Sequence, residues 1–218
     1  MNAFNNASSE YDNFRKHAIP LMDAFYNTTI ELTIGFENPK ILDLGAGTGI
    51  LTELIYETYP DSEITLIDMS YDMLKLAKKK FKGISNFKYV EADYLTYDFG
   101  QKYDIILSSL SIHHLDDSEK QFLYKKVYDS LNDDGIFINA DEVLGMTPKT
   151  EQIYKNRENN YLESQDISQE QKNIIKERRK LDKPSTMIDN MSWFEEIGYR
   201  NVDVFYKYYR YFVIYGQK

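Results

Sequence analysis

Apolar and polar positions alternate in blocks along the first two thirds of the chain, and the period of the pattern changes from block to block. Between helical segments, short runs rich in β-branched and aromatic residues predict strands near residues 40–44, 63–68, 87–92, 103–109 and 135–141. Apolar residues at helical spacing predict helices near residues 49–59, 70–81 and 117–131. This alternation is typical of an α/β fold, in which a mostly parallel sheet carries helices on both faces.

The pattern changes after the fifth predicted strand, in residues 142–185. Thr147 followed by Pro148 predicts a helix start, and Ser168 with Gln171 fits a capping box. The two inserted helices carry too few apolar positions for a core of their own, so we expect them to form a lid or a dimer interface. A further helix and two tyrosine-rich runs, which predict an antiparallel hairpin, complete the chain.

The first predicted strand runs into a glycine-rich loop, KILDLGAGTG, at residues 40–49. Gly45, Gly47 and Gly49 alternate with other residues, whereas the dinucleotide-binding fingerprint places its third glycine one position later. Glycines let a ligand approach the main chain closely. With Asp43 two residues upstream, this tight spacing suits a cofactor that has a ribose and an amino-acid tail but no phosphate.

Acidic residues mark the ends of three successive predicted strands: Asp43, Asp68 and Asp93. Ligands bind at this edge of open α/β sheets. Asp68 can accept hydrogen bonds from both ribose hydroxyls, and Asp93 can accept one from the exocyclic amine of adenine. Met69 and Met73 can flank the adenine, or they can be ordinary core residues. The alternative for the acids is that each caps the helix after it.

With the glycine loop and the acidic series, the chain resembles the class I S-adenosylmethionine-dependent methyltransferases over roughly residues 38–218. The resemblance implies a Rossmann-like sheet of seven strands in the order 3-2-1-4-5-7-6, the last strand antiparallel. It implies S-adenosylmethionine as cofactor and S-adenosylhomocysteine as product. The expected cofactor-binding residues are Tyr11, Arg15, Asp43, Gly45, Ala46, Gly47, Thr48, Gly49, Asp68, Met69, Met73, Asp93, Tyr94, Ser108 and Ser109.

Two adjacent histidines, His113 and His114, follow the fourth predicted strand and resemble an H-H-L sequence in many small-molecule methyltransferases. Adjacent residues do not share a face of a strand or helix, so we expect at most one, His113, to face the pocket. Its ordinary pKa near neutrality makes it the candidate general base. The alternative is that both histidines pack at a helix start.

Residues 1–37 are expected to form a helical lid before the first strand. In related proteins such a segment closes over the cofactor, and by that resemblance Tyr11 and Arg15 contact cofactor or substrate. A surface helix would also carry such residues. The whole architecture is also similar to carboxy-S-adenosylmethionine synthase, which needs cationic groups for a carboxylate. Arg178 and Arg179 of this chain could serve in that role, or they could belong to a solvated run of charges. That family places a serine where Gly47 stands.

Length and charge narrow the remaining possibilities. We expect the 218 residues to form one domain, and the net charge of −9 disfavours non-specific nucleic-acid binding. Cysteine is absent and only three histidines are present, so we expect no metal site. The chain has no apolar run of membrane-spanning length, and a cytoplasmic location is expected.

These features together predict an enzyme that methylates a small molecule by in-line transfer. A carboxy-S-adenosylmethionine synthase-like enzyme of transfer-RNA modification, a non-catalytic binder of the cofactor and, more remotely, a nicotinamide oxidoreductase are the alternatives.

Overall fold

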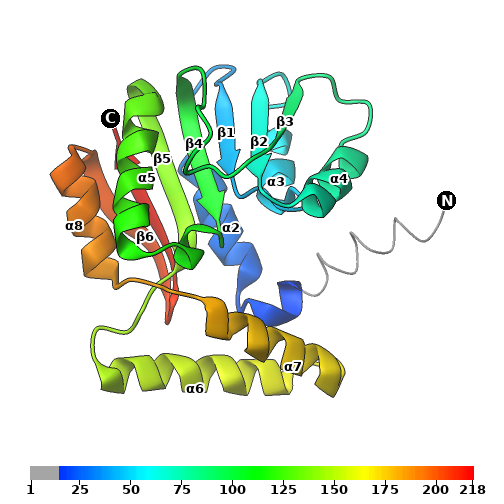
Figure 1. Cartoon of the computed structure of the whole chain (residues 1–218), viewed down its shortest axis with the longest axis vertical. Coiled ribbons are helices and arrows are strands. Elements are labelled where there is room, and N and C mark those ends of the chain that lie inside the picture. The colour runs from blue at the N-terminus through cyan, green and yellow to red at the C-terminus, as the bar shows by residue number, and fades with distance from the viewer. Residues whose placement is uncertain (1–14) are drawn as a thin grey trace.

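The computed structural model describes residues 15–218, which fold around one seven-stranded sheet (Figure 1). The strand order is β3-β2-β1-β4-β5-β7-β6, as expected from the family resemblance. The strands are β1 Ile41–Leu44, β2 Ile64–Asp68, β3 Phe87–Glu91, β4 Tyr103–Ser109, β5 Leu131–Glu142, β6 Arg200–Tyr208 and β7 Tyr211–Gln217.

Strands β1 to β5 are parallel, and β7 runs antiparallel to both β5 and β6. The predicted strands are confirmed with one difference, since β5 begins at Leu131 rather than near residue 135. Leu131 is buried and pairs with Tyr103, and the register shifts before Ile105 pairs with Ile136. An irregular pairing of this kind leaves no regular alternation in the sequence to reveal the start of the strand.

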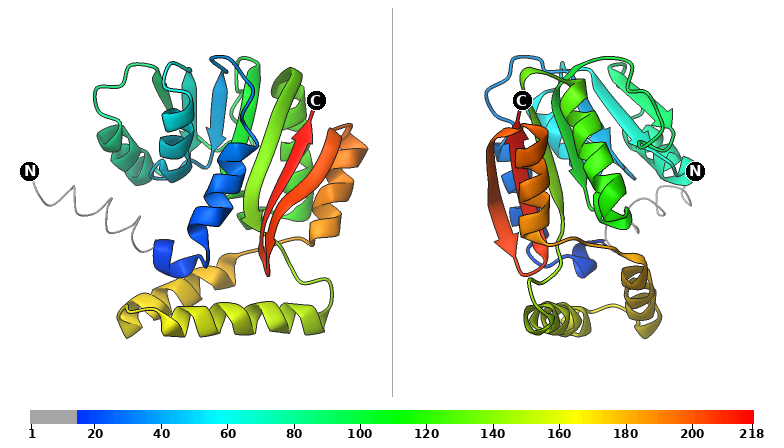
Figure 2. Two further views of the ribbon diagram at one scale, coloured as in Figure 1. Left: turned by 180° about the vertical axis from the view of Figure 1, so that it is seen from behind. Right: turned by 60° about the vertical axis from the view of Figure 1, so that its left-hand side comes forward.

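Helices cover both faces of the sheet (Figures 1 and 2). One core contains residues of α2 Met22–Glu31, α3 Ile50–Thr58 and α4 Tyr71–Lys80. The other contains residues of α5 Asp117–Ser130 and α8 Met187–Ile197. Helix α4 agrees with the prediction from the sequence. Ser70 caps the helix, and Leu74 and Ala77 are buried.

The inserted helices are α6 Pro148–Ser164 and α7 Gln169–Arg178, which lie across the carboxyl edge of the parallel strands (Figures 1 and 2). Both predicted N-caps are confirmed, since the hydroxyl groups of Thr147 and Ser168 accept hydrogen bonds from the third residues of their helices. The 3-10 turn Arg179–Leu181 ends this insertion before α8.

The insertion also contacts the first described residues of the chain. Tyr161 Oη donates to the carbonyl oxygen of Lys16 over 3.1 Å, and Arg179 donates to that of Ala18 over 3.3 Å. Helix α2, by contrast, packs on the sheet, where Phe25 and Tyr26 are buried. Within the expected lid of residues 1–37, the described part that lies against the inserted helices is therefore the short segment before α2. Among residues 15–218, no helix is both long and apolar enough to cross a membrane.

Candidate active site

The glycine loop between β1 and α3 is built on three left-handed residues. Gly45, Gly47 and Gly49 have φ values of +67°, +57° and +78°. A Cβ atom on Gly45 would meet Ser111, and one on Gly49 would meet the ring of Phe81. At Gly47 the same position has no described atom within 4 Å, so the backbone there is open to a ligand.

Asp68, at the end of β2, lies against this loop. Its Oδ2 accepts a hydrogen bond from Gly47 N–H over 2.8 Å, and its Oδ1 accepts one from Ser70 N–H over 2.7 Å. Each carboxylate oxygen can accept more than one hydrogen bond, so the side chain keeps acceptor capacity for a ligand. The backbone contacts fix its orientation beside the open face of Gly47.

Asp43, at the end of β1, is buried under the loop. Thr52 Oγ1 donates to its Oδ2 over 2.5 Å, whereas its Oδ1 has no hydrogen-bond partner among the described residues. Burial raises the pKa of Asp43 to about 7, opposed by the Thr52 hydrogen bond and reinforced by the negative charge of Asp68. A cationic ligand could provide the hydrogen bond that this buried carboxylate oxygen lacks.

A small hollow beside the loop gathers many of the predicted cofactor residues. Those that line it are Arg15, Asp43, Gly45, Ala46, Gly47, Thr48 and Ser109, together with Tyr26, Ile50 and Leu51. Tyr26 is absent from the sequence-based expectation. It comes from α2, and its hydroxyl accepts a hydrogen bond from Ser109 Oγ over 3.1 Å. Nothing in the local pattern distinguishes it from the other tyrosines of the chain.

Other predicted residues lie outside the lining of this hollow. Ser108 is buried, and its hydroxyl donates to the carbonyl oxygen of Leu44 over 2.8 Å. Asp93 is exposed beyond β3, where its Oδ1 accepts from Leu95 N–H, and Tyr94 contacts Ser111. Gly49, Asp68, Met69 and Met73 also fall outside the lining, and Tyr11 is outside the described residues.

A second, larger cavity of about 180 Å³ adjoins the first, and residues of α7 line it. Its wall contains residues from the start of the chain, from the turn after β4, from the end of β5 and from α7. The histidines and charged residues in this wall are Arg15, His113, His114, Glu142, Arg178, Arg179 and Asp182.

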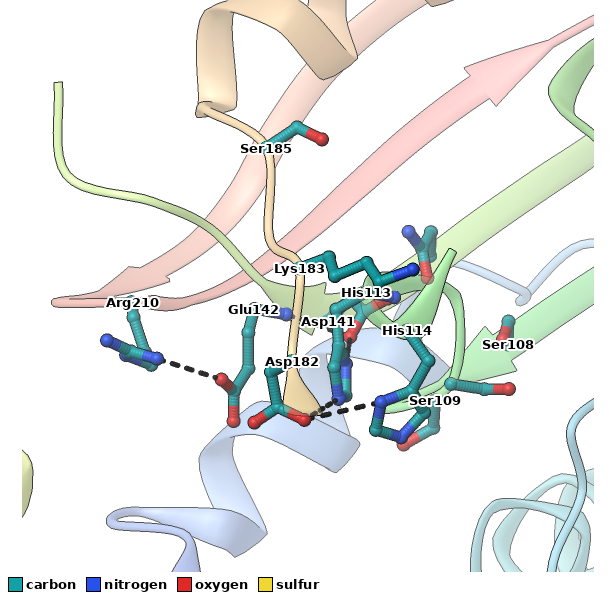
Figure 3. A network of polar contacts seen from close by, with 12 residues as sticks. Ser108, Ser109, His113, His114, Asp141, Glu142, Asp182, Lys183, Ser185 and Arg210 are labelled. Carbon is teal, nitrogen blue, oxygen red and sulfur yellow. Dashed lines mark hydrogen bonds and ion pairs between the residues drawn. The ribbon is translucent and has the colours of Figure 1, made fainter. Parts of the chain in front are cut away.

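His113 and His114 both line this larger cavity, so the expectation that only one of them faces a pocket is wrong. They lie in the 3-10 turn Ile112–His114, whose backbone is neither strand nor α-helix. Figure 3 shows both imidazole rings turned toward Asp182, which comes from the segment between α7 and α8. The His113 side chain is 6% exposed and that of His114 54%.

His113 lies between two carboxylates. Its Nδ1 contacts Asp141 Oδ1, and its Nε2 is 3.4 Å from Asp182 Oδ1. Burial alone would lower the pKa of His113, but Asp141, and after it Asp182, raise it to about 10. A histidine that keeps its proton at neutral pH cannot accept another, so its surroundings give no support to the predicted general-base role.

Asp141, Glu142 and Asp182 are residues of this site that sequence reasoning missed. Asp141 and Glu142 lie at the carboxyl end of β5. An acid at the end of a strand is the same pattern that pointed to the acids of the earlier strands, so it could have identified these two residues. Asp182 follows a polar insertion, and only the fold brings it to the histidines.

Known proteins resemble this chain over most of its length. A sequence profile of the methyltransferase domain matches residues 41–135, which include the glycine loop and both histidines. The carboxy-S-adenosyl-L-methionine synthase of Nautilia profundicola is 25% identical over 208 residues, covering 92% of this chain and 87% of that protein. The chain is therefore similar in sequence to S-adenosylmethionine-dependent enzymes that contain a methyltransferase domain.

Two further comparisons show similarity to methyltransferases, one in sequence and one in fold. Malonyl-[acyl-carrier protein] O-methyltransferase 1 of Ilyobacter polytropus is 30% identical over 122 residues, covering 55% of this chain and 43% of that protein. The structure of human N-acetylserotonin methyltransferase in complex with S-adenosylmethionine shares the fold, with a TM-score of 0.60 and 19% identity. That alignment covers 88% of this chain and 51% of the human chain, so this chain spans about half of the human protein's length.

Proposed function

We propose that this methyltransferase transfers the methyl group of S-adenosylmethionine to a small-molecule acceptor that binds in the larger cavity. The observation that carries the proposal is the junction of the two hollows. Arg15 lines both of them, and the consecutive residues Ser109 and Leu110 line one each. A cofactor at the glycine loop and an acceptor in the larger cavity would therefore meet at the end of β4.

The residues around the loop fit S-adenosylmethionine. The open face of Gly47 admits a ligand, and Asp68 beside it can accept hydrogen bonds from ribose hydroxyls. The partnerless Oδ1 of Asp43 suits an ammonium group or sulfonium charge. The cofactor supplies a methyl group that its sulfonium already activates.

The protein's part in the reaction is then mainly positioning. Correct alignment of two bound reactants in a site shielded from water can supply roughly 7 to 11 kcal/mol of the barrier. Helix α7 contributes to the wall of the cavity, and the buried Nη1 atom of Arg179 in this wall has no hydrogen-bond partner among the described residues. This guanidinium group favours an acceptor with an acidic oxygen, such as a carboxylate.

A carboxy-S-adenosylmethionine synthase-like reaction is the second candidate, because relatives of that name align with almost the entire chain. Arg178 and Arg179 do lie in the cavity wall, as a bound carboxylate would require. The third candidate is a non-catalytic protein that binds the cofactor. The glycine loop supports binding of the cofactor and does not by itself indicate turnover.

Mass spectrometry of the small molecules separates the three candidates. The purified protein is incubated with S-adenosylmethionine, a panel of small carboxylic acids and hydroxy compounds, and a metabolite extract. We expect S-adenosylhomocysteine together with an acceptor heavier by one methyl group. A cofactor heavier by one carboxyl group would replace the proposal with the second candidate, and unchanged cofactor in every mixture would replace it with the third.

A further inference from the structure

Three side chains with metal-ligating atoms meet in the wall of the larger cavity. Asp182 Oδ1 is 3.4 Å from His113 Nε2 and 3.3 Å from His114 Nδ1, and the ligating atoms of the three residues lie within 4.8 Å of one another (Figure 3). We propose that His113, His114 and Asp182 bind a divalent metal ion.

The spacing of these atoms fits metal ligands as well as it fits ion pairs. A charge-assisted hydrogen bond between nitrogen and a carboxylate measures about 2.7 to 2.9 Å. Ligands at about 2.0 to 2.1 Å from a tetrahedral metal ion are about 3.3 to 3.4 Å apart, as the geometry of a tetrahedron requires. Both distances to Asp182 Oδ1 fall in this second range.

Asp141 supports His113 as a ligand through the other ring nitrogen. It contacts Nδ1, which leaves Nε2 directed at Asp182. The Asp141 side chain is itself held by the backbone N–H groups of His113 and Glu142, each over 2.9 Å. A carboxylate behind a histidine in this way is the usual support of a metal-bound imidazole, because it fixes the ring orientation.

Asp182 is held in place by the backbone around it. Lys183 N–H donates to the carbonyl oxygen of His113 over 2.9 Å. The buried Lys120 donates from Nζ to the carbonyl oxygen of Lys183 over 2.5 Å and to Ser185 Oγ over 2.7 Å. The segment that carries Asp182 is therefore attached to the sheet at the histidines, and a metal ion would join the inserted helices to the same point.

Two imidazoles and one carboxylate suit Zn²⁺, Fe²⁺, Co²⁺ or Mn²⁺ rather than Ca²⁺ or Mg²⁺. Because all three residues line the cavity, a metal ion held by them could also take an acceptor oxygen as a ligand. Binding of an acceptor by the metal ion rests on the proposed methyl transfer, whereas binding of the metal ion by the protein does not. The proposal departs from the expectation of no metal site, because the sequence does not show that Asp182 meets the histidines.

Titration with Co²⁺ tests metal binding in the absence of S-adenosylmethionine, with visible absorption as the readout. We expect one Co²⁺ per chain, with bands typical of nitrogen and oxygen ligands, which Zn²⁺ displaces. His114→Asn should weaken binding by about tenfold or more, since loss of supporting residues alone costs that much. His114 is half exposed, so this variant should fold.

His17→Asn is the matched control, because His17 is the other histidine of the chain and contacts Gln165 outside the cluster. We expect it to bind Co²⁺ as the unmodified protein does, and Asp182→Asn to lose affinity as His114→Asn does. Absence of Co²⁺ binding, or affinity unchanged in both cluster variants, would overturn the proposal and make the cluster an ion pair only. Because no methyl transfer is measured, either result is independent of the proposed function.

Discussion

At the scale of single residues, Asp68 links the glycine loop to the expected ribose. Asp68→Ala should weaken binding of S-adenosylmethionine by about 2 to 4 kcal/mol, since the ligand hydroxyls lose a charged acceptor. Isothermal titration calorimetry measures the loss. Asp72→Ala, an exposed acid in the first turn of α4, is the control and should bind normally. A binding constant within twofold of that control would show that Asp68 only flanks the helix.

Gly47 offers a second test at this scale. Gly47→Ala places a methyl group in open space, so its effect on folding is limited to a strained φ of +57°, about 1 kcal/mol. A bound cofactor would meet that methyl group, and we expect its affinity to fall at least tenfold. Gly35→Ala is matched, because Gly35 also has a positive φ and open space but lies away from the loop. Equal affinities in the two variants would contradict the placement of the ligand.

Asp43 predicts a pH dependence. Its raised pKa means that the folded protein holds a proton that the unfolded chain releases, so its contribution to stability is present at low pH and is lost as pH rises toward 7. The loss is about 4 kcal/mol at most. Asp43→Asn should remove it, so the difference in unfolding free energy between the two proteins should change between pH 4 and 8. A constant difference in urea titrations would refute the raised pKa.

At the scale of elements, a buried ion-pair cluster attaches α6 to the sheet. Arg210, just before β7, is 3.0 Å from Glu151 and 2.8 Å from Glu158 of α6, and 3.3 Å from Glu142. Burial raises the pKa of Glu158 to about 7 although Arg179 and Arg210 oppose it. The charge of Glu158 therefore depends on its cationic partners.

Arg210→Met should remove the cation that these three carboxylates share and loosen the attachment of α6 to the sheet. We expect faster amide hydrogen exchange in α6 with little change in β1 and β4. The matched variant is Arg200→Met, because the Arg200 pair with Asp134 is exposed and contributes about 0 to 1 kcal/mol. If exchange in α6 is equal in the two variants, the cluster does not hold the helix.

The cover formed by residues 142–185 and the segment before α2 is expected to move as one unit. Its apolar contacts are sparse, and catalysis requires both entry of substrate and exclusion of water. Cofactor should slow hydrogen exchange in both parts, while β1 stays protected throughout. If hydrogen exchange in residues 142–185 does not change when ligands are added but slows at higher protein concentration, these residues form a dimer interface instead.

At the scale of the whole molecule, the sheet could be predicted because each of its signals is local. The apolar run at β1, the cap at Ser70 and the spacing of Gly45, Gly47 and Gly49 each act within a few residues of chain. Strand order came from the family resemblance. The larger cavity could not be predicted, since Asp182 reaches His113 only after the insertion folds back over the sheet, and Tyr26 reaches Ser109 only through packing of α2.

The central claim is that the glycine loop binds S-adenosylmethionine rather than a dinucleotide, and calorimetry on the full chain tests it most directly. S-adenosylmethionine, S-adenosylhomocysteine and NAD are titrated separately into the protein. The account predicts one site per chain for each of the first two ligands, competition between them, and no measurable heat from NAD. NAD that binds more tightly than either ligand would contradict it.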